Sequence, residues 1–354
     1  MKKVLYWMAS TVLAAGFFAV IFSSCSDHNG SGSAQSAQVG LYITDDMADY
    51  KQVVATITKV QVLHTGSGAV CDLLTTAETL DIAELSQMLQ LVTVSTCTAV
   101  PYNRIHLEFE KSVELMNNAD IASPCSFTSY KDQGTAPNVL QCNGSTCSLD
   151  INGAVNVLVN QQNKLALDFE LKNFDVANFG DPATCSVTMK VSPLHAVDME
   201  ARGHPEGITG LISGLSTTDQ TFTLTRGNTV FSVLYSGITS SRQPGIDSLL
   251  QLAQTDNLLV KVVSSSIDFS AQTIAATAVY VKAEGTVSNL DATARTFTLT
   301  YKAGKTIMVD YSAADVDGIF ADGGWVALKL YGFDGEKYLA SKIEVWESSM
   351  TTDD

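Results

Sequence analysis

The fold is decided by a stretch that occurs twice, GLISGLSTTDQTFTLT at residues 210–225 and GTVSNLDATARTFTLT at residues 285–300. The two copies lie 75 residues apart and are identical at nine of sixteen positions. In TFTLT, which ends both copies, apolar residues alternate with threonine, and a period of two is typical of a β-strand with one buried face. Repetition at a fixed spacing indicates that one supersecondary unit has been built twice.

Each copy opens a longer unit in which further alternating segments match. The matching segments are SVLYS (232–236) with MVDYS (308–312), LLVKVV (258–263) with WVALKLY (325–331), and AATAVYVK (275–282) with LASKIEVWE (339–347). Each unit thus holds about five strands in roughly 70 residues. Five short strands, the first beginning with glycine, predict a small Greek-key barrel of the OB type. We expect two tandem barrels, repeat 1 at residues 206–283 and repeat 2 at residues 284–348.

The two repeats resemble an uncharacterised OB-like bacterial domain that commonly occurs in tandem. Barrels of this type often bind oligonucleotides or oligosaccharides. Neither repeat combines a basic groove with the stacking aromatic side chains that single-stranded nucleic acid requires. Phe222 and Phe297 occupy equivalent positions and are predicted to lie in the core. Because each repeat supplies its own apolar positions, residues 206–348 are expected to fold without the preceding part.

Residues 39–202 contain many alternating segments and one short helical pattern. The clearest strand-like segments are VGLYIT (39–44), VVATITKVQVLH (53–64), KLALDFEL (164–171) and CSVTMKV (185–191). IAELSQMLQLV, residues 82–92, has the spacing of a short helix. Many strands with polar turns predict a β-sandwich, so the whole chain is expected to be all-β.

The order LYITDD, ITKVQVL, LDIAEL, VPYNRIHLEF, LALDFEL and MKVSPLHAV resembles an N-terminal domain of bacterial lipoproteins. That family has no assigned function, and the resemblance implies a prealbumin- or immunoglobulin-like sandwich over residues 39 to about 200. Two turn details depart from the family pattern. Met47 stands where proline is usual, and Pro101 precedes Tyr102 where glycine is usual.

The first 24 residues have the order of an export signal. Lys2 and Lys3 precede an apolar run over residues 4–22, and small residues lead to Cys25. The ending resembles a bacterial lipoprotein signal, which implies cleavage before Cys25 and lipid attachment to it, although Phe22 stands where that pattern prefers leucine. The alternative is a single membrane-spanning helix, because the run approaches the length of about 20 residues that spanning requires.

A segment rich in Gly, Ser, Ala and Gln follows Cys25 and predicts a flexible tether over residues 25–38. Ser26 resembles the outer-membrane sorting choice of enteric bacteria. The expected location is therefore the bacterial cell envelope, with the protein held by lipid, in the outer membrane.

Seven cysteines leave one without a partner unless Cys25 is set apart for lipid. The other six are expected to form disulfides, because disulfides persist outside the cytoplasm. They are Cys71, Cys97, Cys125, Cys142, Cys147 and Cys185. Zinc is the competing interpretation, but the chain has neither a C-x-x-C pair nor a nearby H-x-x-x-H. The spacing of the six cysteines does not determine which of them pair, although the tight CNGSTC loop favours Cys142–Cys147.

The net charge of the chain limits the classes of partner that it can bind. Without residues 1–24 the chain has 19 basic and 37 acidic residues, a net charge of −18. An acidic surface repels phosphate backbones, so no nucleic-acid partner is expected. Abundant Thr, Ser, Val and Gly agree with a strand-rich fold.

Candidate chemical sites are few. Asp45, Asp46 and Asp49 cluster at a strand end and offer oxygens to calcium, but their spacing is not an EF-hand loop, and aspartate at turns ordinarily bonds its own backbone. Asp168 and Glu170 share one strand face and are expected to be solvated. Arg104 interrupts an apolar strand and indicates either protection of a sheet edge, the commoner case, or an ion pair.

No catalytic motif of recognised spacing occurs, and four of the five histidines, His64, His106, His195 and His204, are scattered. We therefore expect no catalytic residue, no cofactor and no metal. The favoured hypothesis is a non-catalytic, lipid-anchored envelope protein for binding, adhesion or assembly, whose partner is an envelope protein or a polysaccharide. The alternatives are an envelope hydrolase or carbohydrate-active enzyme with an unrecognised site, and a calcium-dependent surface adhesin.

Overall fold

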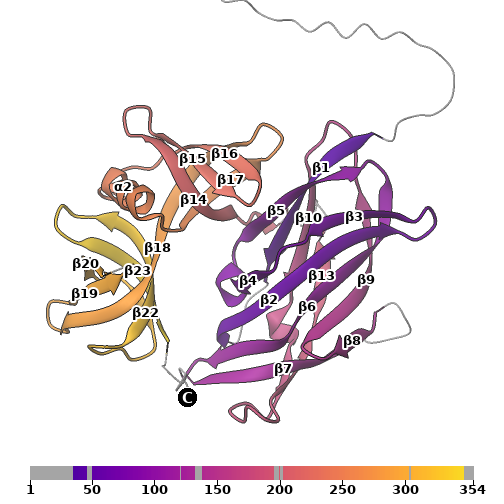
Figure 1. Cartoon of the computed structure of the whole chain (residues 1–354), viewed down its shortest axis with the longest axis horizontal. Coiled ribbons are helices and arrows are strands. Elements are labelled where there is room, and N and C mark those ends of the chain that lie inside the picture. The colour runs from indigo at the N-terminus through magenta and orange to yellow at the C-terminus, as the bar shows by residue number, and fades with distance from the viewer. Residues whose placement is uncertain are drawn as a thin grey trace, which may run out of the picture. The chain divides into compact units, whose positions relative to one another are not determined.

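The protein is all-β, as the strand patterns predict, and strands dominate the described residues (Figure 1). The computed structural model describes residues 35–45, 50–119, 121–131, 138–194, 199, 202–302 and 304–346. The predicted signal and Cys25 lie outside these ranges. The first strand begins at Ser36, so the end of the predicted tether belongs to a strand. None of the helices in the described ranges has the length and apolar character needed to cross a membrane.

The N-terminal part is a sandwich of two sheets. The strands from this part in the first sheet are β13 (Val191–Leu194), β10 (Asn163–Phe169), β1 (Ser36–Thr44) and β5 (Leu89–Thr98). The second sheet has the order β11 (Asp175–Ala177), β12 (Ser186–Met189), β7 (Ala122–Tyr130), β6 (Pro101–Asn117), β2 (Tyr50–His64) and β3 (Ala69–Leu74), with β4 (Glu78–Asp81), β8 (Leu140–Asn143) and β9 (Thr146–Asn156) at its sides. Apolar residues from both sheets form one buried cluster.

Strand β1 is buried on both faces, which explains its nearly continuous apolar sequence. Leu41 and Ile43 belong to the core of the sandwich. Tyr42, between them, points to the other face and belongs to a second apolar cluster, which extends into the repeats. Its hydroxyl donates a hydrogen bond of 2.8 Å to the buried carboxylate of Glu206.

The six cysteines form three disulfides, which confirms that prediction. The bonds are Cys71–Cys97, Cys125–Cys185 and Cys142–Cys147, so the favoured pair is also confirmed. Cys71 lies on β3 and Cys97 on β5, so their bond joins the two sheets of the sandwich. All three lie in the N-terminal part.

The two repeats have the same order of strand pairing. In repeat 1, β14 (Glu206–Ser216) pairs with β15 (Thr221–Arg226) and with β17 (Val260–Asp268), while β18 (Thr273–Asp291) pairs with β17 and with β16 (Thr229–Leu234). In repeat 2, the end of β18 pairs with β19 (Thr296–Tyr301) and with β22 (Trp325–Phe333), while β23 (Tyr338–Trp346) pairs with β22 and with β20 (Lys305–Asp310).

The connection between the third and fourth strands differs between the repeats. Repeat 1 has the helix α2 (Ile246–Asp256), and repeat 2 has the short strand β21 (Asp315–Asp317). Sequence analysis missed α2, because strand-like segments lie on both sides of its 11 residues. Gly245, with φ +58°, precedes the helix at a point where a Cβ would lie 2.2 Å from the carbonyl oxygen of Phe333. Only glycine fits there.

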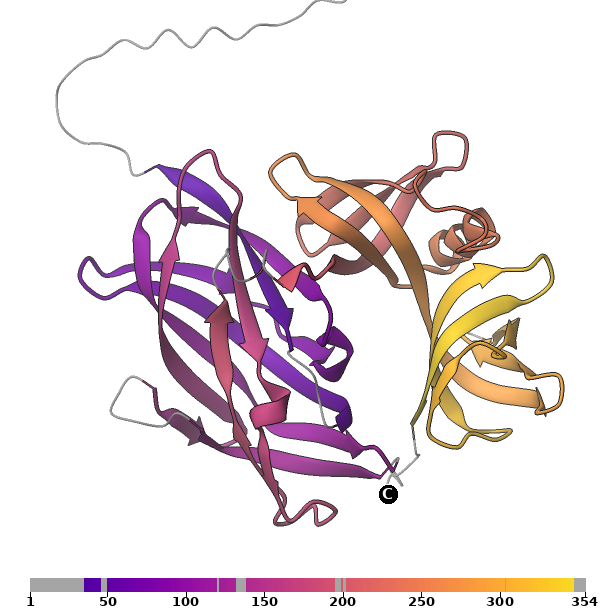
Figure 2. The same ribbon diagram turned by 180° about the vertical axis from the view of Figure 1, so that it is seen from behind.

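The repeats are not separate from each other or from the sandwich. Strand β18 runs without interruption through both repeats (Figures 1 and 2). Strand β14 also pairs in parallel with β5, so one sheet of 14 strands includes parts of the sandwich and of both repeats. The second apolar cluster likewise combines residues of all three. The apolar residues of the two repeats thus belong to one cluster, and the independent folding of residues 206–348 stays a prediction.

The prediction of a helix over residues 82–92 is wrong. Only the 3-10 helix η1 (Ala83–Leu85) forms there, and β5 begins at Leu89. Leu85, Leu89 and Val92 fit a helical spacing in the sequence, but in the structure Leu89 and Leu91 alternate along β5 and pack into the second cluster. In so short an apolar run, the spacing of a helix and the spacing of a strand cannot be told apart.

We predict that Phe222→Ala lowers the free energy of unfolding by about 3–5 kcal/mol. Phe222 is 2% exposed and packs against Tyr235, whose hydroxyl bonds to Asp247 of α2. Urea denaturation followed by near-ultraviolet circular dichroism measures the loss. Thr223→Ala, at the neighbouring and partly exposed position, is the control and should change stability little. Equal stability of both variants would contradict the core assignment.

Candidate functional site

Three lysines lie side by side on neighbouring strands of the first sheet. Lys282 of β18 is directly opposite Lys329 of β22, and Lys329 is directly opposite Lys342 of β23. Their sequence neighbours on these strands, such as Val281 and Leu330, are buried in the second cluster, so strand alternation sends the lysines to the other face. Like charges directly opposite one another destabilise a sheet. The arrangement therefore needs counter-charges.

A fourth lysine, Lys261 of β17, lies beside this row. It is 2% exposed, and its strand neighbours Val260 and Val262 are fully buried. Burial, together with the charge of Lys329, lowers the pKa of Lys261 to about 8. We call Lys261, Lys282, Lys329 and Lys342 the lysine row.

Glu84 of η1 supplies the central counter-charge. Its Oε1 lies 3.4 Å from Lys342 Nζ and its Oε2 lies 3.9 Å from Lys261 Nζ, and its side chain is 11% exposed. Burial alone would raise the pKa of Glu84, but the four charges of the lysine row hold it well below its ordinary value. A carboxylate from the N-terminal part thus neutralises lysines that come from both repeats.

Lys342 is the most heavily paired member of the row. Besides Glu84, its Nζ lies 2.8 Å from Glu344 and 3.3 Å from Asp317. Burial lowers the pKa of Lys342, but the charges of Glu344 and Glu84 outweigh burial and raise it well above the ordinary value. Burial raises the pKa of Glu344, even though Lys342 opposes the change.

Asp81 adds a carboxyl group with a different role. Its Oδ1 accepts hydrogen bonds from the backbone N–H groups of Val53 (3.0 Å) and Ala83 (3.2 Å), so it holds the start of η1. Its Oδ2 is buried and has no hydrogen-bond partner among the described residues. Burial raises the pKa of Asp81 to about 7, against an ordinary value of 3.8. Near neutral pH this carboxyl group is therefore partly protonated.

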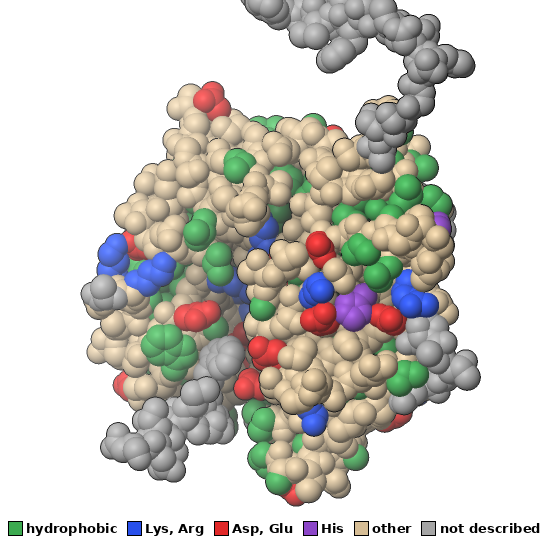
Figure 3. All heavy atoms as spheres, turned by 45° about the vertical axis from the view of Figure 1, so that its right-hand side comes forward, with side chains coloured by type: hydrophobic (Ala, Val, Ile, Leu, Met, Phe, Trp, Pro, Cys, Tyr) green, Lys and Arg blue, Asp and Glu red, His purple; other side chains and the backbone are tan. Residues whose placement is uncertain are grey.

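Apart from Lys261 and Asp317, these groups line a cavity of about 230 Å³, which we call the lysine cavity. Its lining side chains are mainly charged and polar: Gln52, Val54, Thr79, Asp81, Glu84, Lys282, Glu284, Ala327, Leu328, Lys329, Lys342 and Glu344. Figure 3 shows basic side chains inside a hollow of the surface, with acidic side chains at its rim. Such a cavity offers charged groups of both signs to a small polar ligand.

A larger cavity, of about 690 Å³, lies beside Glu206. Its two charged lining residues, Lys164 and Glu206, form an ion pair with each other. Glu206 also accepts hydrogen bonds from Tyr42 and from the backbone N–H of Ile267 (2.9 Å). These groups are engaged in holding β14 to the sandwich, so the smaller cavity is the better candidate.

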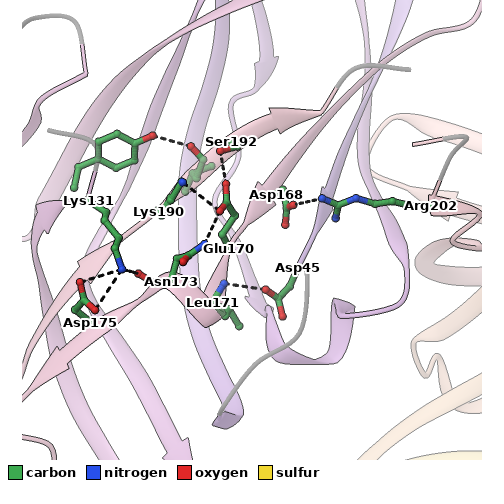
Figure 4. Close-up of polar contacts among 12 residues, drawn as sticks. Asp45, Lys131, Asp168, Glu170, Leu171, Asn173, Asp175, Lys190, Ser192 and Arg202 are labelled. Carbon is green, nitrogen blue, oxygen red and sulfur yellow. Dashed lines mark hydrogen bonds and ion pairs between the residues drawn. The ribbon is translucent and has the colours of Figure 1, made fainter. Parts of the chain in front are cut away.

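Of the three calcium candidates, Asp45 lies among the described residues and makes a structural contact. Asp45 is fully buried, and its Oδ1 accepts a hydrogen bond of 3.0 Å from the backbone N–H of Leu171 (Figure 4). That bond caps the 3-10 helix η2 (Leu171–Asn173). Asp46 and Asp49 lie outside the described residues.

Asp168 and Glu170 differ from the expectation of a solvated face. Asp168 is 2% exposed, and its Oδ2 accepts a hydrogen bond of 2.7 Å from Arg202. Glu170 accepts hydrogen bonds from Ser192 and Asn173, and Figure 4 shows it turned toward those residues. Strand alternation alone does not reveal that Asp168 is covered by the chain that follows β13.

Arg104 belongs to an ion-pair row on the second sheet, not to an edge. Strand β6 pairs with β2 and β9 on its two sides, so the interpretation as edge protection is wrong. His106 lies 2.6 Å from Asp150 and 3.0 Å from Glu108, and Arg104 lies 3.8 Å from Asp150. Their side chains are partly exposed, and exposed ion pairs contribute little to stability. His195 lies outside the described residues.

Sequence analysis missed the lysine row and Glu84. The matching strands of the repeats contain Lys261 and Lys329, but the pattern of the strands assigns these lysines no role. A lysine within an apolar strand is itself a signal, because burial of an ammonium group requires a partner. The same signal in the corresponding strands of both repeats marks this face of the sheet.

Comparison with protein families finds one match, the model described as Domain of unknown function (DUF4382), over residues 36–180. The match covers less than half of the chain and ends before both repeats. It agrees with the expected resemblance of the N-terminal part to a domain without an assigned function. It includes Asp81 and Glu84 but none of the four lysines. A comparison with curated proteins found no match.

We predict that Glu84→Gln lowers the free energy of unfolding by about 3–5 kcal/mol, because it leaves the buried lysine row without its central carboxylate. Chemical denaturation at neutral pH measures the loss. Glu110→Gln, at an exposed position of β6, is the matched control and should stay within about 0.5 kcal/mol of the parent. A Glu84→Gln variant as stable as the control would show that the lysines do not depend on Glu84.

We predict that Asp81→Asn changes how stability depends on pH. The pKa of Asp81 is higher in the folded chain than in the unfolded chain, so its contribution to stability falls as the pH rises from about 4 to 7. Asparagine keeps an oxygen for Val53 and Ala83 and does not ionise. Relative to the parent, the variant should gain about 2 kcal/mol of stability between pH 5 and pH 7.5. Urea denaturation at the two pH values tests this, and parallel pH profiles would contradict it.

Proposed function

We propose that this chain is a lipid-anchored, non-catalytic protein of the bacterial cell envelope that serves binding or assembly. The observation that carries the proposal is the set of three disulfides in the N-terminal part. Disulfides form and persist in oxidising compartments and are rare in the cytoplasm. An extracytoplasmic location agrees with the export signal and with Cys25 as the cysteine left for lipid.

We also propose that each repeat is an OB-like unit. Its support is the pairing order, in which the first strand pairs with the second and the fourth, and the fifth pairs with the third and the fourth. The third and fifth strands are parallel in both repeats, and the other pairs are antiparallel. One parallel pair among antiparallel neighbours agrees with a five-stranded Greek-key arrangement.

A binding role is supported by where the lysine cavity lies. Its lining residues come from the N-terminal part and from repeat 2, and repeat 1 contributes Lys282 of β18. Ligand pockets are often formed where parts of a protein meet. The partner that we propose is an envelope protein or a polysaccharide.

We predict that Cys25→Ser releases the protein from the membrane fraction, because serine lacks the sulfur through which the lipid is attached. Fractionation in the native host followed by a carbonate wash measures this, and labelling with a radioactive fatty acid should disappear in parallel. Ser26→Ala is the control and should remain membrane-bound. A Cys25→Ser variant that resists the carbonate wash would favour the membrane-spanning alternative.

A further inference from the structure

We propose that the lysine cavity binds a small oxyanion, a carboxylate or phosphate group, between the ammonium groups of Lys282 and Lys329. The inference rests on the proposed binding function and names the chemistry of its ligand. It is carried by the distribution of ion pairs inside the cavity.

The ion pairs leave two of the lysines without a carboxylate. Lys342 contacts Glu84, Glu344 and Asp317, and Lys261 contacts Glu84. Among the described residues, no carboxylate oxygen lies within 4.0 Å of the Nζ atom of Lys282 or Lys329. The ammonium group of Lys329 lies over the ring of Tyr280, with 4.9 Å between Nζ and the ring centroid. Both side chains line the cavity.

The positions of these two lysines suit one shared anion. They are directly opposite on neighbouring strands, so their Cβ atoms are about 4.5–5.5 Å apart. An oxyanion has several acceptor oxygens and can accept from both ammonium groups at once. It would replace the repulsion between them with two attractions. Neither lysine has to leave another carboxylate to make these bonds.

The lining has four carboxyl groups and three ammonium groups, and their pairing leaves Lys282 and Lys329 open to an anion. Glu84 stays ionised in spite of its burial because all four lysines act on it. Glu84 and Glu344 are already held by Lys342, and the described residues contain no cluster of acidic, histidine or cysteine side chains that could hold a metal ion. Asp81 is partly protonated near neutral pH, so it adds less negative charge to the cavity than a fully ionised carboxylate would.

The size of the cavity limits the ligand. A volume of about 230 Å³ is several times the roughly 30 Å³ that a water molecule occupies in the liquid. It accommodates inorganic phosphate or a single acidic sugar. A longer chain must extend past the exposed residue Glu284 at the rim. The proposal therefore concerns one acidic group and not a polyanion.

The test uses the full chain purified in detergent. Its Tm is measured against increasing sodium phosphate, sodium galacturonate and sodium chloride at matched ionic strength. We expect phosphate or galacturonate to raise the Tm by at least about 2 °C more than chloride does, with a saturable dependence on concentration. A rise with phosphate alone identifies phosphate groups as the ligand chemistry, and a rise with galacturonate alone identifies acidic sugars. If neither exceeds chloride, the proposal is overturned.

Single substitutions show which residues the ligand-dependent rise in Tm requires. Lys282→Gln and Lys329→Gln should each abolish the ligand-dependent rise, because each removes one of the two donors. Lys337→Gln, in the turn between β22 and β23 and outside the cavity lining, should keep it. Far-ultraviolet circular dichroism checks that each variant is folded. A rise that persists in both cavity variants would place the anion elsewhere and overturn the proposal.

A direct measurement on the parent protein guards against loss of folding in the variants. The parent should broaden the phosphorus NMR signal of phosphate, or saturation-transfer NMR should show contacts with galacturonate. Absence of both signals overturns the proposal. Failure here leaves the proposed anchoring intact, because Cys25 is tested by fractionation and plays no part in anion binding.

Discussion

The contact between Glu84 and the lysine row is the constraint on which the rest of the structure depends. Four ammonium groups from four strands lie on one face of a sheet, and their mutual repulsion and partial burial both cost free energy. The carboxylate that offsets this cost comes from η1, a short element far away in the sequence. The N-terminal part and the repeats are thus joined by electrostatics as well as by hydrogen bonds and apolar packing.

Three further features join the N-terminal part and the repeats. Strand β18 serves both repeats, β14 adds to β5, and one apolar cluster includes residues from Tyr42 to Val345. The disulfides, by contrast, all lie in the N-terminal part. The covalent bonds therefore constrain the sandwich directly, and the repeats benefit only through the sheet that they share with it.

Sequence reasoning succeeded where a local pattern determines the outcome. TFTLT indicates a strand whether or not its neighbours are known, and both phenylalanines are buried. The tight loop between Cys142 and Cys147 favours a short-range bond. Sequence reasoning failed where contacts with distant segments determine the structure. Arg202 covers Asp168, and lysines of the repeats cover Glu84. Leu89 belongs to β5, which forms a strand because β1 and β14 pair with its two sides. No window of a few residues contains that information.

The position of β1 has a mechanical consequence. It is the first strand among the described residues, and it lies within the sheet, hydrogen-bonded to β10 in parallel and to β5 in antiparallel orientation. A pull applied at Ser36 along the strand acts in shear, so the hydrogen bonds on both sides resist together and do not break one after another. Resistance to forced unfolding is set by the rate of crossing the unfolding barrier. A protein held to a surface at this end would therefore withstand tension through a strand that is paired on both sides.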